Sequence, residues 1–190
     1  MILLAIGLIL FFGIHSVSIV APAWRNAQVA TRGEGPWKGL YSTASAAGLL
    51  LIIYGYGIAR QSPVVLYTPP AGLRHVALLL MLPVFPLLLA AYLPGRIKAV
   101  TKHPMLVSIK LWALAHLLAN GALADVLLFG GFLAWAVADR ISVKRRPARP
   151  VPGAPARPIN DLIAVVAGLA LYAVFVLWAH QWMTGVSPLA

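Results

Sequence analysis

Long apolar stretches are the feature that most constrains how this chain can fold. About 20 apolar residues in a helix cross the hydrocarbon core of a bilayer, where the backbone must satisfy its own hydrogen bonds. Six such stretches lie at roughly residues 1–21, 40–59, 74–93, 105–119, 121–138 and 161–182. They do not alternate between polar and apolar residues, as the strands of a membrane barrel do. The sequence therefore predicts an all-α fold, a polytopic bundle of about six transmembrane helices forming one domain over residues 1–190.

Two details of the spans can be read from turn and helix-breaking residues. Asn120 and Gly121 form a strong turn pair between the fourth and fifth stretches, which predicts a tight helical hairpin. Because both stretches are short, a re-entrant pair is the alternative. Pro83 and Pro86 lie inside the third stretch and predict a kink whose exposed backbone groups need a neighbouring partner.

The basic residues indicate the orientation of the chain. A formal net charge of +11 would suggest nucleic acid as a partner for a soluble protein, but here the charge gathers in the connections between spans. The connections after the first, third and fifth spans hold twelve Lys and Arg residues, whereas the opposite side holds only Arg60 and Arg74. The positive-inside rule then predicts a multi-pass protein of the bacterial inner membrane, with both termini outside the cytoplasm and no nucleic-acid partner.

The last basic connection, at about residues 140–160, is rich in proline. Five prolines between residues 144 and 158 prevent a helix and favour an extended linker. Its charge is expected to attract anionic lipid headgroups on the cytoplasmic side. A dedicated partner-binding tail is the alternative.

The composition also excludes several kinds of chemistry. The chain has no cysteine, which rules out disulfides, thiolate ligands and the covalent attachment of c-type haem. It has only four carboxylates, which disfavours paired-carboxylate catalysis and carboxylate-rich di-metal sites.

Two histidines inside apolar stretches are the strongest candidates for a function. An ionisable ring in hydrocarbon is costly, so it usually faces the bundle interior with a partner or a task. His15 is expected ~9 Å and His116 ~17 Å from the cytoplasmic side, at 1.5 Å per helical residue. Neutral imidazoles on two helices could hold the iron of haem b in an apolar slot. Histidines hydrogen-bonded across helices are the alternative. His75, His103 and His180 are expected to have structural or surface roles.

Further residues are candidates for contacts with the cofactor. Arg25, Lys38 and Arg96 lie at the predicted cytoplasmic edge and could pair with haem propionates. Trp112 could line the pocket. The alternatives are topology and lipid contact for the cations, and plain packing for the tryptophan.

Several short motifs resemble the NnrU family of integral membrane proteins. They are Trp-Lys-Gly-Leu-Tyr at residues 37–41, Ala-Tyr-Leu-Pro-Gly-Arg at 91–96, His-Pro-Met-Leu at 103–106, Leu-Trp-Ala-Leu-Ala-His-Leu-Leu-Ala-Asn-Gly at 111–121 and Leu-Ala-Trp at 133–135. The resemblance implies a helical membrane protein linked to nitrite and nitric oxide metabolism in denitrifying bacteria.

The same family is similar to the plant 15-cis-ζ-carotene isomerase, a membrane enzyme whose haem b is held by two histidines. The resemblance places those ligands at His15, in the pair His15-Ser16, and at His116, in the run from Trp112 to His116. Ala113 stands where the isomerase has a cysteine that is proposed as an alternate ligand, so ligand exchange through a thiol is not expected here.

These observations lead to one main hypothesis and two alternatives. The main hypothesis is a membrane haem b protein with iron held by His15 and His116, in a redox or isomerase-like role that could include a lipophilic substrate. The first alternative is a non-catalytic scaffold or maturation factor for a respiratory enzyme. The second is a small membrane methyltransferase, which the pair His103-Pro104 matches only loosely.

Overall fold

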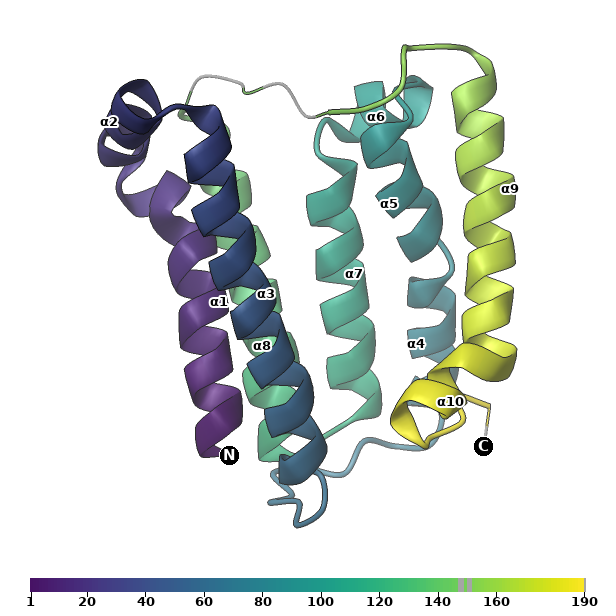
Figure 1. Ribbon diagram of the computed structural model, residues 1–190. Coiled ribbons are helices and arrows are strands. Elements are labelled where there is room, and N and C mark those ends of the chain that lie inside the picture. Colours follow the sequence, from purple (N-terminus) through teal and green to yellow (C-terminus); the bar gives the residue numbers. More distant parts are fainter. Residues whose placement is uncertain (147–148, 150–151, 190) are drawn as a thin grey trace.

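The computed structural model describes residues 1–146, 149 and 152–189, and this part of the chain is helical almost throughout (Figure 1). The helices are α1 (Ile2–Val20), α2 (Pro22–Arg32), α3 (Glu34–Ala59), α4 (Leu73–Met81), α5 (Val84–Tyr92), α6 (Arg96–Thr101), α7 (Pro104–Ala119), α8 (Leu123–Ser142), α9 (Ile159–Val174), the π-helical turn η1 (Phe175–Ala179) and α10 (His180–Thr184). The described residues contain no β-strand, only an isolated bridge between Val65 and Ala122. The predicted all-α fold is confirmed.

Four helical segments are long and apolar enough to cross a membrane. They are Ile2–Val20, Glu34–Ala59, Leu73–Tyr92 and Ile159–Thr184. Helix α7 is apolar but has 16 residues, and α8 has 20 residues that include Asp125, Asp139 and Arg140. A helical membrane bundle is therefore confirmed, whereas the predicted count of six spans is not.

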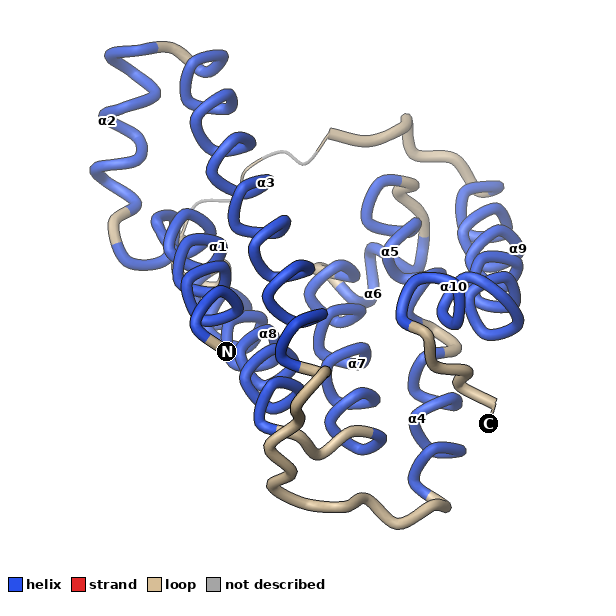
Figure 2. The backbone as a smooth tube through the Cα atoms, turned by 60° about the horizontal axis from the view of Figure 1, so that its bottom comes forward, coloured by secondary structure: helices blue, strands red, loops and turns tan. Residues whose placement is uncertain are grey.

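Helix α7 joins two groups of helices. It packs against α8, which lies with α1 and α3, and also against α4 and α5, which lie with α9. Figures 1 and 2 show α7 between the two groups and antiparallel to α8, as the predicted helical hairpin requires. The two candidate residues on α7, Trp112 and His116, therefore lie on the helix that contacts both groups.

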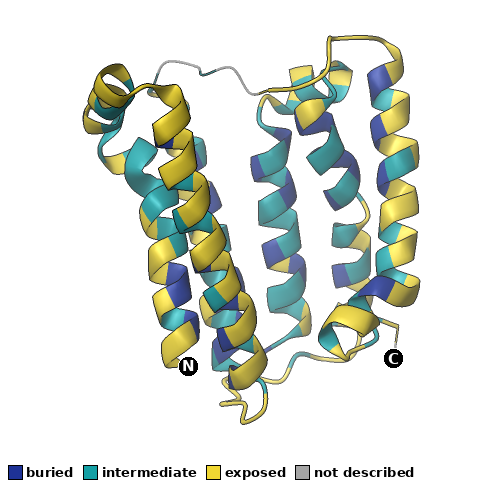
Figure 3. Ribbon diagram, in the orientation of Figure 1, coloured by how far each residue is buried: buried dark blue, intermediate teal, exposed yellow. Residues whose placement is uncertain are grey.

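Helices α1 and α3 approach each other closely because glycines remove the side chains between them. A Cβ added at Gly55 would lie 2.4 Å from the backbone nitrogen of Leu4, and one at Gly48 would lie 2.8 Å from that of Phe11. Leu4 and Ile52 fill the buried side of this contact, while much of the outer surface of the bundle is exposed and apolar (Figure 3). Small residues at such crossings allow the close packing that drives helix association in lipid.

The predicted kink in the third span appears as a break between α4 and α5. The amide of Leu82 donates to the carbonyl of Leu79, which is a tighter turn than an α-helix makes, and α5 begins after Pro83. The buried hydroxyl of Ser108 on α7 donates to the carbonyl of Val84 at 2.9 Å. A side chain of the neighbouring helix α7 thus hydrogen-bonds to a backbone carbonyl at the break, as the two prolines predict.

The two ends of the bundle differ in charge. Helices α2 and α6 and residues 143–146 after α8 lie at one end, here called the basic end, and both ends of the described chain lie at the opposite end (Figure 1). At the basic end, Arg146 donates to the carbonyl of Ser18 and Arg149 donates to the hydroxyl of Ser18. Residues 147, 148, 150 and 151 of the predicted proline-rich linker lie outside the described part, and residues 152–157 are not helical.

Candidate functional site

The two intramembrane histidines line different cavities. His15 faces a cavity of about 630 Å³ that is lined by α1, α2, α3, α5, α7 and α8 near the basic end, here called the basic-end cavity. His116 faces a cavity of about 260 Å³ that is lined by α4, α7, α9 and the C-terminal turns, here called the opposite-end cavity. The structure therefore does not bring the two rings together at one site.

Aromatic side chains fill the space between the two histidines. The ring of Phe11 stacks on His15 with centroids 4.0 Å apart, and Phe132 lies 5.5 Å beyond Phe11. Trp112 follows at 5.4 Å from Phe132 and lies 5.3 Å from His116. We call the rings of Phe11, Phe132 and Trp112 the aromatic column. An imidazole binds a metal at roughly 2 Å, and His15 and His116 line different cavities with the aromatic column between them, so one iron cannot contact both rings in this arrangement.

Each histidine is nevertheless prepared to act as a ligand. The Nδ1 atom of His15 lies 2.7 Å from the carbonyl oxygen of Phe11, and that of His116 lies 2.8 Å from the carbonyl of Trp112. A carbonyl only accepts, so Nδ1 must donate, and in the neutral ring the lone pair is then on Nε2. Histidines that bind metals through Nε2 commonly have this backbone contact.

The walls of the basic-end cavity are mostly aromatic and aliphatic. Tyr41 and Trp135 flank His15 with centroid distances of 5.1 and 5.7 Å. Met105 and Ile109 of α7 line the same cavity. The indole Nε1 of Trp135 is buried and has no hydrogen-bond partner among the described residues. A ligand with an acceptor atom would satisfy this donor, because a buried N–H without a partner costs free energy.

Cationic side chains line the same cavity. Arg25, Lys38 and Arg146 are among its lining residues, together with one carboxylate, Asp139. Arg146 pairs with Asp139 at 2.8 Å, and both side chains are mostly buried. Lys38 pairs with Glu34 at 3.0 Å on the exposed surface of α3. The cavity therefore keeps an excess of positive charge, which suits an anionic group.

Two of the predicted cofactor contacts lie with His15 and two lie elsewhere. Arg25 and Lys38 line the basic-end cavity. Arg96 is exposed at the start of α6, where its backbone amide donates to the carboxylate of Asp161 at 2.7 Å. Trp112 lines neither cavity and belongs to the aromatic column.

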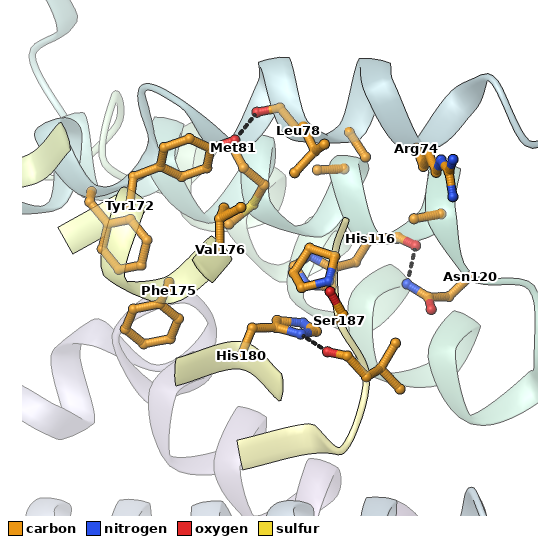
Figure 4. Close-up of a pocket in the computed structure, with 16 residues that line it drawn as sticks. Arg74, Leu78, Met81, His116, Asn120, Tyr172, Phe175, Val176, His180 and Ser187 are labelled. Atoms are coloured by element: carbon orange, nitrogen blue, oxygen red, sulfur yellow. Dashed lines mark hydrogen bonds between the residues drawn. The ribbon is translucent and has the colours of Figure 1, made fainter. Parts of the chain in front are cut away.

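His180, expected from the sequence to have a structural or surface role, lies beside His116. The two rings have centroids 6.4 Å apart and an angle of 30° between their planes. The Nδ1 atom of His180 lies 2.7 Å from the carbonyl of Val186, which leaves its Nε2 available as well. Figure 4 shows the two rings facing each other in the opposite-end cavity. A signal for this pairing was present in the sequence. His116 lies three residues before the end of α7 and His180 lies four residues before the end of α10, so both are near a helix end.

The other two histidines lie outside both cavities. His75 is exposed near the start of α4. His103 precedes α7 at the basic end, outside the spanning segments. Its pKa is lowered, mainly because partial burial disfavours the charged ring and also because Arg140 is near. The lowered pKa favours the neutral ring at pH 7, and the side chain makes no capping hydrogen bond to α7.

Metal binding by a larger group of ligands finds no support in the structure. Among the described residues, no three His, Asp or Glu side chains lie close enough together to hold an ion. A metal centre in this part of the chain would depend on one or two imidazoles and on ligands of other types.

Comparison with known proteins identifies the family. No curated protein and no solved structure matches the chain significantly. The family model described as NnrU protein matches residues 3–188, which is nearly the whole chain. The aromatic column, both cavities and all five histidines lie within the matched residues, and the chain belongs to the NnrU family.

Proposed function

We propose that this protein binds haem b in the basic-end cavity, with His15 as the axial ligand of the iron. The observation that carries the proposal is the combination found around His15. One cavity holds an imidazole with a free Nε2, an aromatic wall with an unpartnered indole N–H, and several cations. A lipophilic ring system with carboxylate groups matches each of these features.

The dimensions and chemistry of the cavity agree with this ligand. Its volume of about 630 Å³ lies within the usual range of small-molecule and cofactor sites, roughly 300–1,000 Å³. The rings of Phe11, Phe132 and Trp135 offer flat apolar surface to a macrocycle. Arg25 and Arg146 can form charge-assisted hydrogen bonds with propionates, which are stronger than neutral ones.

The separation of the histidines changes the expected role of the iron. Two histidine ligands would close both axial positions, which suits electron transfer. With His15 as the only histidine ligand, haem bound in this cavity could also take up a small ligand or the edge of a lipophilic substrate. Bound haem then supplies reversible binding or activation of such a ligand. The link of the family to nitrite and nitric oxide metabolism makes nitric oxide the first ligand to test.

The orientation belongs to the same proposal. The basic end, with α2, α6 and the segment after α8, lies in the cytoplasm of a bacterial cell, and both termini lie outside the inner membrane. The concentration of Lys and Arg at this end supports the assignment through the positive-inside rule. Anionic headgroups of the inner leaflet are the expected partners of these side chains.

Absorbance of the purified protein in detergent tests the proposal. After expression with ample haem supply, the wild type is expected to show a Soret band and a haem-to-protein ratio near one. His15→Ala is expected to lose most of the haem, because no other imidazole faces this cavity. His116→Ala and the exposed control His75→Ala are expected to keep the wild-type spectrum.

Three results would contradict this assignment. A wild type without a Soret band excludes haem, and a His15→Ala protein with an unchanged spectrum excludes His15 as the ligand. If His15→Ala and His116→Ala alter the spectrum equally, the iron is held by both histidines, and the helices must rearrange when haem binds.

A further inference from the structure

The opposite-end cavity holds a pair of imidazoles that the haem proposal does not use. Both Nδ1 atoms contact backbone carbonyls, of Trp112 for His116 and of Val186 for His180. Each neutral ring therefore presents a lone pair on Nε2. Among the described residues, no donor contacts either Nε2. These two Nε2 atoms are neighbouring acceptors in one cavity. A cation, or a group that donates hydrogen bonds, would satisfy both if it were bound between them.

The spacing of the rings suits a shared metal ion. Two imidazoles that bind one ion through nitrogens at about 2.0–2.1 Å have ring centroids roughly 5–6.5 Å apart, depending on the angle at the metal. The observed separation of 6.4 Å lies within this range. The cavity of about 260 Å³ is below the usual size of cofactor sites and is ample for an ion.

The remaining lining residues indicate which ion fits. Met81 of α4 lines the same cavity and offers a thioether, and no carboxylate is among the described lining residues. Thioether and imidazole ligands together favour monovalent copper over hard cations. The cost of burying an ion rises with the square of its charge, and neutral ligands offer no compensation, so a monovalent ion is favoured again.

The local backbone is arranged to place His180. The π-helical turn η1, at Phe175–Ala179, ends directly before it and shifts the register of the last helical residues. Such turns occur frequently at functional sites. Gly185 then takes a left-handed conformation with φ of 75°, which turns the chain back so that the carbonyl of Val186 meets Nδ1 of His180. Arg60 holds this turn by donating to the carbonyl of Thr184 at 2.9 Å.

We propose that His116 and His180, with Met81 as a third ligand, bind one monovalent copper ion near the end of the bundle that carries the termini. The ligands come from α7, α10 and α4, so binding of the ion joins three helices that meet at this cavity (Figure 4). The site is separate from the haem cavity, and neither proposal depends on the other.

Anaerobic titration of the full-length protein in detergent tests the site. The probe is Cu(I), held by a chromophoric chelator that competes for the ion. The wild type is expected to remove one equivalent from the chelator, and His116→Ala and His180→Ala are expected to bind roughly 100-fold more weakly or worse, since even indirect partners of a metal are worth 10–100-fold. Met81→Leu, which keeps the side-chain volume, is expected to lose about tenfold. His75→Ala, an exposed histidine at the same end, is expected to bind like the wild type.

X-ray absorption of the copper-loaded wild type gives a measurement that does not depend on the folding of variants. The expected first shell has two nitrogens at about 2.0 Å and one sulfur at about 2.3 Å. Failure to take copper from the chelator, equal binding by the two histidine variants and the wild type, or a first shell without imidazole nitrogen would overturn the proposal.

Discussion

Gly55→Ala is expected to lower the free energy of unfolding by about 2–3 kcal/mol, the cost of overpacking a well-packed contact. The new methyl carbon would lie 2.4 Å from the backbone nitrogen of Leu4 and 2.7 Å from the carbonyl carbon of Leu3. Both are main-chain atoms, so no side chain can rotate away, and α1 must separate from α3. Thermal unfolding in detergent, followed by circular dichroism, measures the loss.

Gly57→Ala is the matched control on the same helix. No atom lies within 4 Å of a Cβ added there. Alanine is a better helix former than glycine by roughly 0.5–1 kcal/mol, so this variant is expected to be as stable as the wild type or slightly more stable. Equal behaviour of the two variants would show that α1 and α3 are not in close contact.

Gly168→Ala is expected to have the second largest effect, and to act on the other group of helices. A Cβ at this position would lie 2.4 Å from the nitrogen and 2.6 Å from the Cα of Pro86, in the rigid start of α5. Helix α9 must then move outwards and take with it Phe175, which packs against Phe85 with centroids 4.9 Å apart. We expect a loss of stability of about 2 kcal/mol.

The displacement of α9 has a readout at the opposite-end cavity. His180 continues the same helical segment, so its distance from His116 on α7 should grow, and Cu(I) affinity should fall by roughly tenfold, as for other indirect partners of a metal. Gly130→Ala on α8, where no atom lies within 4 Å of an added Cβ, is the control. A Gly168→Ala protein with wild-type stability would contradict the close contact of α5 and α9.

The fold was largely predictable because its main determinant is local. Each spanning helix is encoded by a continuous apolar run, and the break near Pro83 follows from the missing amide of proline and the crowding of its ring. The number of spans was less predictable. Helix α8 contains Asp125, whose carboxylate accepts from Tyr56 at 2.6 Å, and this partner on α3 cannot be inferred from α8 alone.

The sequence could predict which residues belong to the candidate site, but not how these residues are arranged. The cost of a histidine in hydrocarbon singles out His15 and His116, but it carries no information about which helices are neighbours. Pairing depends on packing, and here α8 places Phe132 against both Phe11 and Trp112, between the two histidines. His180 was not singled out because a histidine near a helix end costs little free energy in a membrane. The π-helical turn before it brings the ring close to His116 on α7.

The aromatic column also lies between the two cavities. Phe11 and Phe132 carry no polar side-chain atom, so this part of the column offers protons and small ions no hydrogen-bonded route between the cavities. The haem and copper proposals therefore concern two separate cavities, near opposite ends of the bundle. Removing one of the two proposed ligands should then leave the binding of the other unchanged.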